Sequence, residues 1–392
     1  MYKGGSVSRM KILILVLPLI ATLLRCTRYE EELDVINISN TRGYSEYPAI
    51  AADSRGYFYV VWDEQFITYE SLFIYIAIRE PSGEWSAPEK FFELQWATFP
   101  DIEIDQHNTI HVIWRDTDEQ GWGEVLYTKK KTGCMWTEPE TISVYGMSCN
   151  PDLAVDNLGN VHLVWLEWPT YRVQKIFYAK RTSGGYWSVP IEISEGNVFL
   201  RGFPHIAVTP KGDVHIVWEV TRTDTGPTLS MYAMSNDGIT FTNPAPIHYT
   251  GGRKQEQISQ SITTDYEGVV HVVWTDRGDI FYTWKVNDED WEGPIIILDT
   301  EVYANRPDIT AGADARLHLV WDEENTYLCH TSKPLDGDWT NPTRHAIDMY
   351  GFPSPKAAIS SNCIGVVFTG CTEIDPSGKN NTEVFFVEIP IY

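Results

Sequence analysis

The stretch NPDLAVDNLGNVHLVWLE, Asn150 to Glu167, predicts two short β-strands joined by a tight turn. Each half is rich in apolar and β-branched residues, and Gly, Pro, Asn and Asp bound the halves. Close copies of this hairpin recur, and they are YPAIAADSRGYFYVVWDE (47–64), FPDIEIDQHNTIHVIWRD (99–116), FPHIAVTPKGDVHIVWEV (203–220), SQSITTDYEGVVHVVWTD (259–276) and RPDITAGADARLHLVWDE (306–323), with a weaker seventh in SPKAAISSNCIGVVFTG (354–370).

The repeat has a period near 50 residues, because its anchoring aromatic recurs at intervals of 47 to 56 residues. The anchors are Trp62, Trp114, Trp165, Trp218, Trp274, Trp321 and Phe368. After each hairpin comes a third strand such as KIFYAKR (175–181), and after six of them a fourth strand led by Trp or Phe. Four short strands per repeat predict the blades of a β-propeller.

The seventh repeat has no fourth strand of its own, whereas LDVINISN (33–40) precedes the first repeat without a hairpin. We predict that this N-terminal strand completes the last blade and closes the ring. Closure removes unpaired strand edges, which favour aggregation. The sequence therefore predicts an all-β, seven-bladed propeller of 28 strands as one domain over residues 27–392.

The composition limits the partners of the chain. Its 54 acidic and 30 basic residues give a net charge of −24, which repels phosphate backbones and anionic lipids. We therefore expect no nucleic-acid partner. No clustered Cys and His spacing indicates a metal site, and we expect no cofactor and a monomer.

The N-terminus has the features of an export signal. Lys3, Arg9 and Lys11 precede thirteen apolar residues, 12–24, which are too few to span a bilayer as a helix. Cys26 follows, and the segment LLRC resembles a bacterial lipoprotein signal although Arg25 stands where a small residue is usual. Residues 1–26 thus predict a signal peptide, either cleaved for secretion or lipidated at Cys26, and a location outside the cytoplasm.

The remaining five cysteines are an odd number, so they cannot all pair within the chain. Cys134 and Cys149 flank one predicted strand, and Cys363 and Cys371 flank another. A strand of eight residues separates its ends by about 25 Å, whereas disulfide Cα atoms lie within about 7 Å. We expect no disulfide in either pair.

The turns before the fourth strands resemble the Asp-box, or BNR, repeat of sialidase-like propellers. The best copy is SNDGITF (235–241), and RTSGGYW (181–187) and PLDGDW (334–339) are weaker. The resemblance covers residues 33–392. In this family the box is a structural turn away from the active face, so it implies the architecture and no particular reaction.

Sialidases of the family hold a substrate carboxylate with three arginines, and they use a Tyr/Glu nucleophile pair and an Asp acid. Bidentate pairing with carboxylate explains the arginines. The interblade connections of this chain carry Arg42, Arg201, Arg253 and Arg306. Their spacing to the following strand varies, and the Arg-Ile-Pro signature of sialidases is missing.

A second candidate set follows the proline of each first strand: Asp101, Asp152, His205 and Asp308, with Lys356 in the last repeat. Repeat symmetry should place these residues in a ring near the central channel, joined by the acidic ends of second strands, Glu64, Asp116, Glu167, Asp276 and Glu323. Such a ring could bind a cation or sugar hydroxyls, or supply a carboxylate pair for glycoside chemistry. Because these residues recur with the repeat, the favoured alternative is that they cap strand ends and bond to the neighbouring backbone.

Five histidines share one register in the second strand: His111, His162, His215, His271 and His318. They cannot converge on one metal ion because each belongs to a different blade. We predict that they are structural and hydrogen-bond to the next blade.

Functional differences should lie where the repeat is broken. Examples are His205, the long polar connection 248–260, and the aromatic loops 64–71 and 166–174. His205 near Arg201 and Arg253 would suit a polysaccharide lyase, as in some BNR-type propellers. The leading hypothesis is nevertheless an exported, non-catalytic binding module for a glycan or protein, with a sialidase-like glycosidase or a lyase as the alternative.

Overall fold

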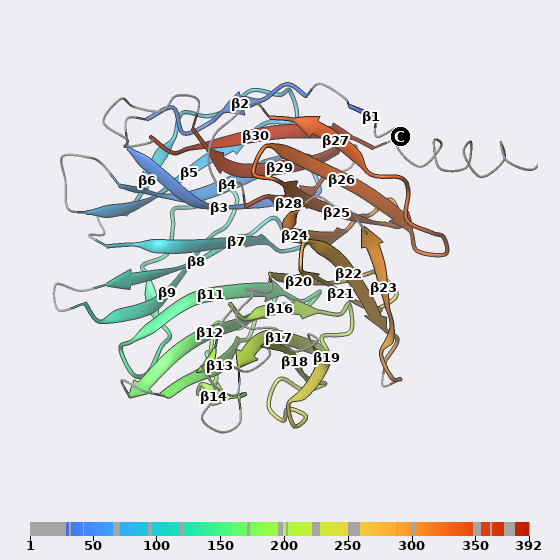
Figure 1. Cartoon of the computed structure of the whole chain (residues 1–392). Coiled ribbons are helices and arrows are strands. Elements are labelled where there is room, and N and C mark those ends of the chain that lie inside the picture. Colours follow the sequence, from blue (N-terminus) through green and yellow to red (C-terminus); the bar gives the residue numbers. More distant parts are fainter. Residues whose placement is uncertain are drawn as a thin grey trace, which may run out of the picture.

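The computed structural model describes most of the propeller region. The described residues are 29–30, 33–41, 43–65, 71–92, 96–117, 121–170, 173–194, 199–200, 203–221, 228–249, 259–287, 289–298, 303–347, 354–360, 363–371 and 381–391. The strands form seven sheets arranged in a ring, and the strands of each blade are antiparallel, so the predicted all-β, seven-bladed propeller is confirmed (Figure 1). No described helix is long and apolar enough to cross a membrane. The candidate signal and Cys26 lie outside the described residues.

Each blade runs from an inner strand at the channel to an outer strand at the rim. Blades 1 to 3 comprise β3 (Tyr44–Ala52), β4 (Phe58–Gln65), β5 (Leu72–Arg79) and β6 (Glu89–Phe91); β7 (Thr98–Ile104), β8 (Ile110–Thr117), β9 (Gly123–Lys130) and β10 (Glu140–Thr141); and β11 (Ser148–Val155), β12 (Val161–Thr170), β13 (Val173–Arg181) and β14 (Ile191–Glu192). Blades 4 and 5 comprise β15 (Phe199–Leu200), β16 (His205–Val208), β17 (Val214–Thr221), β18 (Thr228–Ser235) and β19 (Ala245–Tyr249); and β20 (Gln260–Thr264), β21 (Val270–Asp276), β22 (Asp279–Lys285) and β23 (Glu292–Leu298). Blades 6 and 7 comprise β24 (Ala304–Ala311), β25 (Arg316–Glu323), β26 (Tyr327–Pro334) and β27 (Thr343–Ala346); and β28 (Lys356–Ile359), β29 (Cys363–Gly370) and β30 (Glu383–Pro390).

The ring closes as predicted. The short strand β2 (Ile36–Asn37) pairs with β30 and supplies the outer strand of blade 7, with Ile36 opposite Phe386. The sequence did not predict β1 (Tyr29–Glu30), which adds a parallel strand to β27 of blade 6. The N-terminal segment thus adds outer strands to two neighbouring blades.

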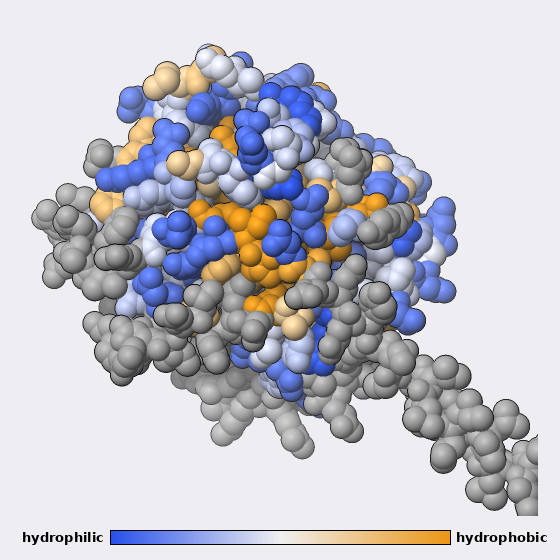
Figure 2. Space-filling view, turned by 90° about the horizontal axis from the view of Figure 1, so that it is seen from above, coloured by the Kyte–Doolittle hydropathy of each residue, from blue (hydrophilic) through white to orange (hydrophobic). Residues whose placement is uncertain are grey.

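The face of the molecule seen from above Figure 1, on the side of β2, is largely hydrophilic. An apolar area appears near its centre (Figure 2).

The aromatic anchors form the core between blades. The six tryptophans and Phe368 are all at most 1% exposed. At four interfaces the aromatic residue that leads a fourth strand packs edge-on against a third-strand tyrosine of the preceding blade, as Trp187 does on Tyr127 with ring centroids 5.2 Å apart. Such edge-to-face aromatic pairs add stability beyond the area that they bury. The recurring aromatics therefore hold neighbouring blades together.

The five register histidines are structural, but the prediction that they hydrogen-bond to the next blade is wrong. Each bonds within its own blade: in blade 3, His162 Nδ1 lies 2.8 Å from Tyr178 Oη, and Nε2 lies 3.3 Å from Asp156 Oδ2. Burial lowers the pKa of His162, so the ring is neutral at pH 7. The tyrosine partner lies on the third strand and the aspartate partner in the hairpin turn of the same blade.

Four blades vary this arrangement. In blade 6, His318 bonds His330 at 3.2 Å in place of a tyrosine, and Asp314 at 3.0 Å. In blade 1, Tyr59 replaces the histidine and its hydroxyl donates to Asp53 at 3.0 Å. In blade 7, Gly365 leaves room for Phe58 of blade 1, which lies 2.6 Å from the place where a Cβ would sit. In blade 4, Thr209 replaces the turn aspartate, and Nε2 of the buried His215 has no hydrogen-bond partner among the described residues.

The cysteine prediction is consistent with the structure. Cys134, Cys149 and Cys363 are free thiols, so neither of the two considered pairs forms a disulfide. Burial raises the pKa of Cys149 to about 12 and that of Cys363 to about 11. These two thiols are therefore uncharged at neutral pH.

Candidate functional site

The residues that follow the first-strand prolines meet around the channel. His205 Nδ1 lies 3.2 Å from Asp152 Oδ2, and Lys356 Nζ lies 3.0 Å from Asp308 Oδ1. These side chains come from four different inner strands. Of the ring residues in the sequence hypothesis, Asp101, Asp152, His205, Asp308 and Lys356 thus interact along the channel wall.

The same side chains join one blade to the next. Asp101 accepts the Leu153 N–H at 3.1 Å, and Asp152 accepts the Ile206 N–H at 2.9 Å. Asp308 likewise accepts the Ala357 N–H at 2.9 Å, and Ser261 Oγ accepts the Ile309 N–H at 3.3 Å. Each partner belongs to the following blade, so this ring supports the channel structurally.

Burial raises the pKa of several acids in the channel. Burial and the charge of the neighbouring Asp152 raise the pKa of Asp101. Glu103 lies one layer deeper, and burial together with both aspartates raises its pKa to about 8. A larger fraction of these channel acids is therefore protonated near neutral pH than of free carboxyls.

The basic members of the ring are shifted in opposite directions. Burial and the charge of Lys356 lower the pKa of His205 to about 3, which leaves its ring neutral at pH 7. Burial opposes the charge on Lys356, but Asp308, Asp152 and Asp101 together raise its pKa. Within the part of the chain that the structure describes, Lys356 is thus a cation that interacts with three channel acids.

Only one of the four candidate arginines can be placed. Arg306 Nη1 lies 3.5 Å from Oδ2 of the buried Asp322. Burial raises the pKa of Asp322 to about 7, although Arg306 opposes the shift. Arg42, Arg201 and Arg253 lie outside the described residues, as do most of the polar connection 248–260 and much of the aromatic loop 64–71.

Two of the acidic residues at the ends of second strands accept hydrogen bonds from groups outside the channel ring. Glu64 is buried and accepts hydrogen bonds from Ser45 Oγ at 2.6 Å and Trp62 Nε1 at 3.1 Å. Glu167 accepts the Val144 N–H at 3.1 Å and Trp165 Nε1 at 2.9 Å. These contacts support the strand-capping interpretation for both glutamates.

The sequence analysis missed an aromatic cluster formed by residues that directly precede prolines. Tyr47 and Phe99 lie with ring centroids 4.3 Å apart, and Phe99 lies 6.1 Å from Phe203. Tyr47 and Phe203 are each 45% exposed. The dipeptides Tyr-Pro, Phe-Pro and Phe-Pro were the available signal. We call Tyr47, Phe99 and Phe203 the aromatic platform.

Backbone geometry positions this platform. Tyr47 and Phe99 have positive φ angles of 48° and 53°, which are uncommon for aromatic residues. The strand register shifts at the same points, between Glu46 and Ala49 and between Thr98 and Asp101. A bulge re-aims a side chain out of the sheet. These bulges bring the two rings together across blades 1 and 2.

Two carboxyls lie beside the platform. Glu46 and Asp63 are cross-strand partners in β3 and β4, which places their Cβ atoms about 5 Å apart. Glu46 is exposed, yet partial burial of its carboxyl raises its pKa. Asp63 is fully buried, accepts the Phe99 N–H at 3.3 Å and has a pKa raised by burial to about 8. Glu46 is thus the reachable acid of the pair.

Comparisons with known proteins identify the fold. No known family model and no curated protein match the chain. Among solved structures, it is similar to the polysaccharide lyase Uly1, with a TM-score of 0.59, 12% identity and 95% coverage of each chain. It is also similar to an α-L-arabinofuranosidase of Fusarium graminearum, with a TM-score of 0.56, 13% identity, and coverage of 92% of this chain and 98% of that one.

A leech intramolecular trans-sialidase is similar as well, with a TM-score of 0.52, 9% identity, and coverage of 76% of this chain and 67% of that one. The chain shares a β-propeller fold with these proteins. The predicted resemblance is therefore confirmed at the level of architecture. At these low identities the likeness establishes the fold and leaves the reaction to be argued from the site.

Proposed function

We propose that this sialidase-like propeller is a glycan-active enzyme, with its substrate site at the aromatic platform beside Glu46. One observation carries the proposal: exposed aromatic rings stand next to a reachable carboxyl with a raised pKa. The similar solved structures include a lyase, an arabinofuranosidase and a trans-sialidase, which supports glycan chemistry more than non-catalytic binding.

The platform suits a sugar ring. Sugars present an apolar C–H face, which packs on aromatic rings, and hydroxyls, which bond to polar groups around such a site. Tyr47 and Phe203 offer exposed aromatic surface, and Glu46 offers a carboxyl directly beside Tyr47. The proposed ligand is therefore a glycan chain end or internal unit that lies over blades 1, 2 and 4.

Glu46 is the proposed general acid. A raised pKa keeps a larger fraction of the carboxyl protonated near neutral pH, as protonation of a leaving oxygen requires. Asp63 is buried behind it and acts as a positioning residue. The channel residues Asp101, Asp152, His205 and Asp308, together with Arg306, form the proposed floor and neighbouring wall of the site.

The remaining sequence predictions complete the proposal. Residues 1–26 would direct export, with either secretion or a lipid anchor at Cys26, and residues 27–392 would act as one domain outside the cytoplasm. The protein would work as a monomer on a glycan, without a nucleic-acid partner. The location agrees with substrates that are glycans of cell surfaces or extracellular polymers.

The test is turnover of a panel that contains arabinan, sialosides and uronate polymers. We expect release of reducing ends, sialic acid or unsaturated uronate from one class, and a loss of about 10²- to 10⁴-fold in kcat for Glu46→Gln. The variant should keep the thermal stability of the wild type because Glu46 is exposed. Binding without turnover would favour the binding-module hypothesis, and equal rates for both proteins would exclude Glu46 as the acid.

A further inference from the structure

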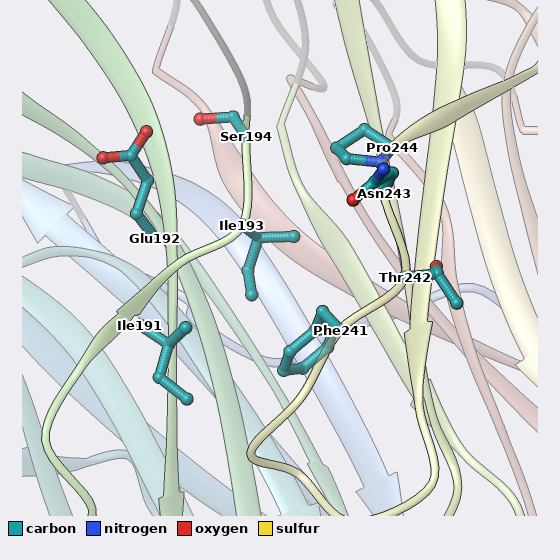
Figure 3. Close-up of a pocket in the computed structure, with 8 residues that line it drawn as sticks. All are labelled: Ile191, Glu192, Ile193, Ser194, Phe241, Thr242, Asn243 and Pro244. Carbon is teal, nitrogen blue, oxygen red and sulfur yellow. The ribbon is translucent and has the colours of Figure 1, made fainter.

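A groove opens at the outer rim of the propeller between blades 3 and 4 (Figure 3). Its volume is about 390 Å³. Residues 191–194 at the end of blade 3 form one side, and residues 241–244 ahead of β19 form the other. This groove lies at the outer strands, whereas the aromatic platform belongs to the inner strands.

The neighbouring interface, between blades 2 and 3, is closed at the corresponding place. Trp187 Nε1 donates to Glu140 Oε2 at 3.0 Å, and Arg181 Nη2 donates to Glu140 Oε1 at 3.0 Å. The Arg181 guanidinium also lies 5.3 Å from the ring centroid of Tyr127. A tryptophan, a glutamate and an arginine therefore fill this interface.

At the interface between blades 3 and 4, other residues occupy the positions of the tryptophan, the glutamate and the arginine. Phe241 stands in place of Trp187, and Ser235 stands in place of Arg181. Ile191 pairs with Tyr178 as Glu140 pairs with Tyr127, so Ile191 stands in place of the glutamate. The side chains that would close the interface are thus exchanged together for smaller or apolar ones.

Ser235 is a further exception to the repeat. The residue six positions before the leading aromatic is basic in five blades, at Arg79, Lys130, Arg181, Lys285 and Lys333. Ser235 instead holds its own turn, because its Oγ accepts the Gly238 N–H at 2.9 Å and bonds Asp237 Oδ1 at 2.8 Å. No long basic side chain therefore enters the groove from this turn.

We propose that this groove binds one sugar unit of a glycan, as a second site apart from the aromatic platform. The choice of a glycan as the ligand rests on the proposed function, whereas the size of the bound unit is inferred from the groove. Phe241 and Pro244 provide apolar surface where the other blades place an indole ring, and Ile191 and Ile193 face them across the opening. A flat, ring-sized ligand fits this space.

Polar groups along the groove match the hydroxyls of a sugar. Glu192, Ser194 and Asn243 also line it. Lys175 Nζ lies 2.6 Å from Glu192 Oε1, which fixes that carboxylate at the edge. Ser194 Oγ accepts the Ile176 N–H at 2.9 Å, which holds this hydroxyl just after the end of β14. Polar atoms make up more of the exposed lining than apolar atoms, which suits a ligand rich in hydroxyls.

The experiment is ligand-observed NMR of the full chain with arabinobiose, 3′-sialyllactose and a uronate disaccharide at millimolar concentration. Two variants close the groove: Phe241→Trp alone, and Phe241→Trp with Ile191→Glu, which copies the Trp187–Glu140 contact. Tyr47→Ala is the control for the aromatic platform. We expect both groove variants to weaken binding of at least one probe by about tenfold or more while Tyr47→Ala leaves that signal in place.

Two results would overturn the inference. One is that both groove variants bind the probes as well as the wild type does. The other is that Tyr47→Ala abolishes every probe signal seen with the wild type, or that the wild type binds no probe. Turnover by Glu46→Gln separates this inference from the proposed function. If closing the groove changes nothing while Glu46→Gln abolishes turnover, only the rim site fails. If groove binding persists while no glycan is turned over, only the enzymatic proposal fails.

Discussion

Blade 4 contains a buried histidine whose counterparts in four other blades are paired with an acid. His215 Nδ1 bonds Tyr232 Oη at 2.8 Å, but Nε2 has no partner among the described residues. In blade 3, Asp156 occupies the position of Thr209 and Asn160 that of Asp213. The double substitution Thr209→Asp with Asp213→Asn therefore copies the turn of blade 3 into blade 4.

The size of the effect follows from the bonds that the turn would gain. In blade 3, Asp156 Oδ2 bonds His162 at 3.3 Å and Asn160 Nδ2 at 2.7 Å, and Oδ1 accepts the Leu158 N–H at 2.9 Å. Leaving a buried polar atom unsatisfied costs about 1–3 kcal/mol, and satisfying it should recover a similar amount. We therefore expect the double variant to raise the free energy of unfolding by about 1–3 kcal/mol.

The gain should depend on pH in a defined direction. Although burial opposes it, hydrogen bonds from His162 and Asn160 lower the pKa of Asp156 below its ordinary value. An aspartate at position 209 should behave alike, so its contribution is present above the unfolded pKa of about 3.9 and is lost as the pH falls through the folded value. The stabilisation should persist at pH 7 and disappear in strong acid.

Urea unfolding followed by tryptophan fluorescence measures the effect, because the anchoring tryptophans are buried. The reverse exchange, Asp156→Thr with Asn160→Asp, is the matched control and should destabilise blade 3 by a similar amount. An unchanged or lower urea midpoint for the blade 4 variant, at an unchanged slope, would refute the reasoning.

Three further predictions concern closure, packing and the channel. Gly365→Ala should destabilise by about 1–3 kcal/mol, because its Cβ would meet Phe58 at 2.6 Å; a thermal midpoint equal to that of the wild type would contradict this packing. Removal of residues up to Asn40 deletes β2 and should expose β30, so sedimentation should detect association, whereas a stable monomer would argue against closure. Burial raises the pKa of Glu103 to about 8, so the wild type should lose stability as the pH rises from about 4.3 towards 8. Glu103→Gln should flatten this part of the stability profile, and an unchanged slope in urea titrations at several pH values would show that Glu103 does not titrate there.

The architecture was predictable because it is repeated. Seven copies of one hairpin fixed the blades, and the missing fourth strand of the last repeat pointed to residues 33–40, which β2 confirms. The histidine partners were not predictable in the same way. His162 bonds Tyr178 and Asp156 in its own blade, and both partners were visible in the repeat only once the strand register was known.

The site was harder to predict because it depends on local backbone geometry. Tyr47 and Phe99 come together through bulges with positive φ, and a repeat pattern does not indicate which way such a residue points. Sequence symmetry did indicate the channel ring. It could not show that Asp152 and Asp308 accept backbone N–H groups of the next blade, because these bonds depend on how the blades are spaced.

The claim that the platform beside Glu46 is a glycan-processing site is tested most directly by one paired measurement. Affinity and turnover would be measured together, on the glycan that the wild type cleaves, for Glu46→Gln and for Tyr47→Ala combined with Phe203→Ala. We predict that Glu46→Gln keeps its affinity and loses turnover, whereas the aromatic variant loses affinity. Wild-type affinity and turnover in both variants would contradict the assignment of this site.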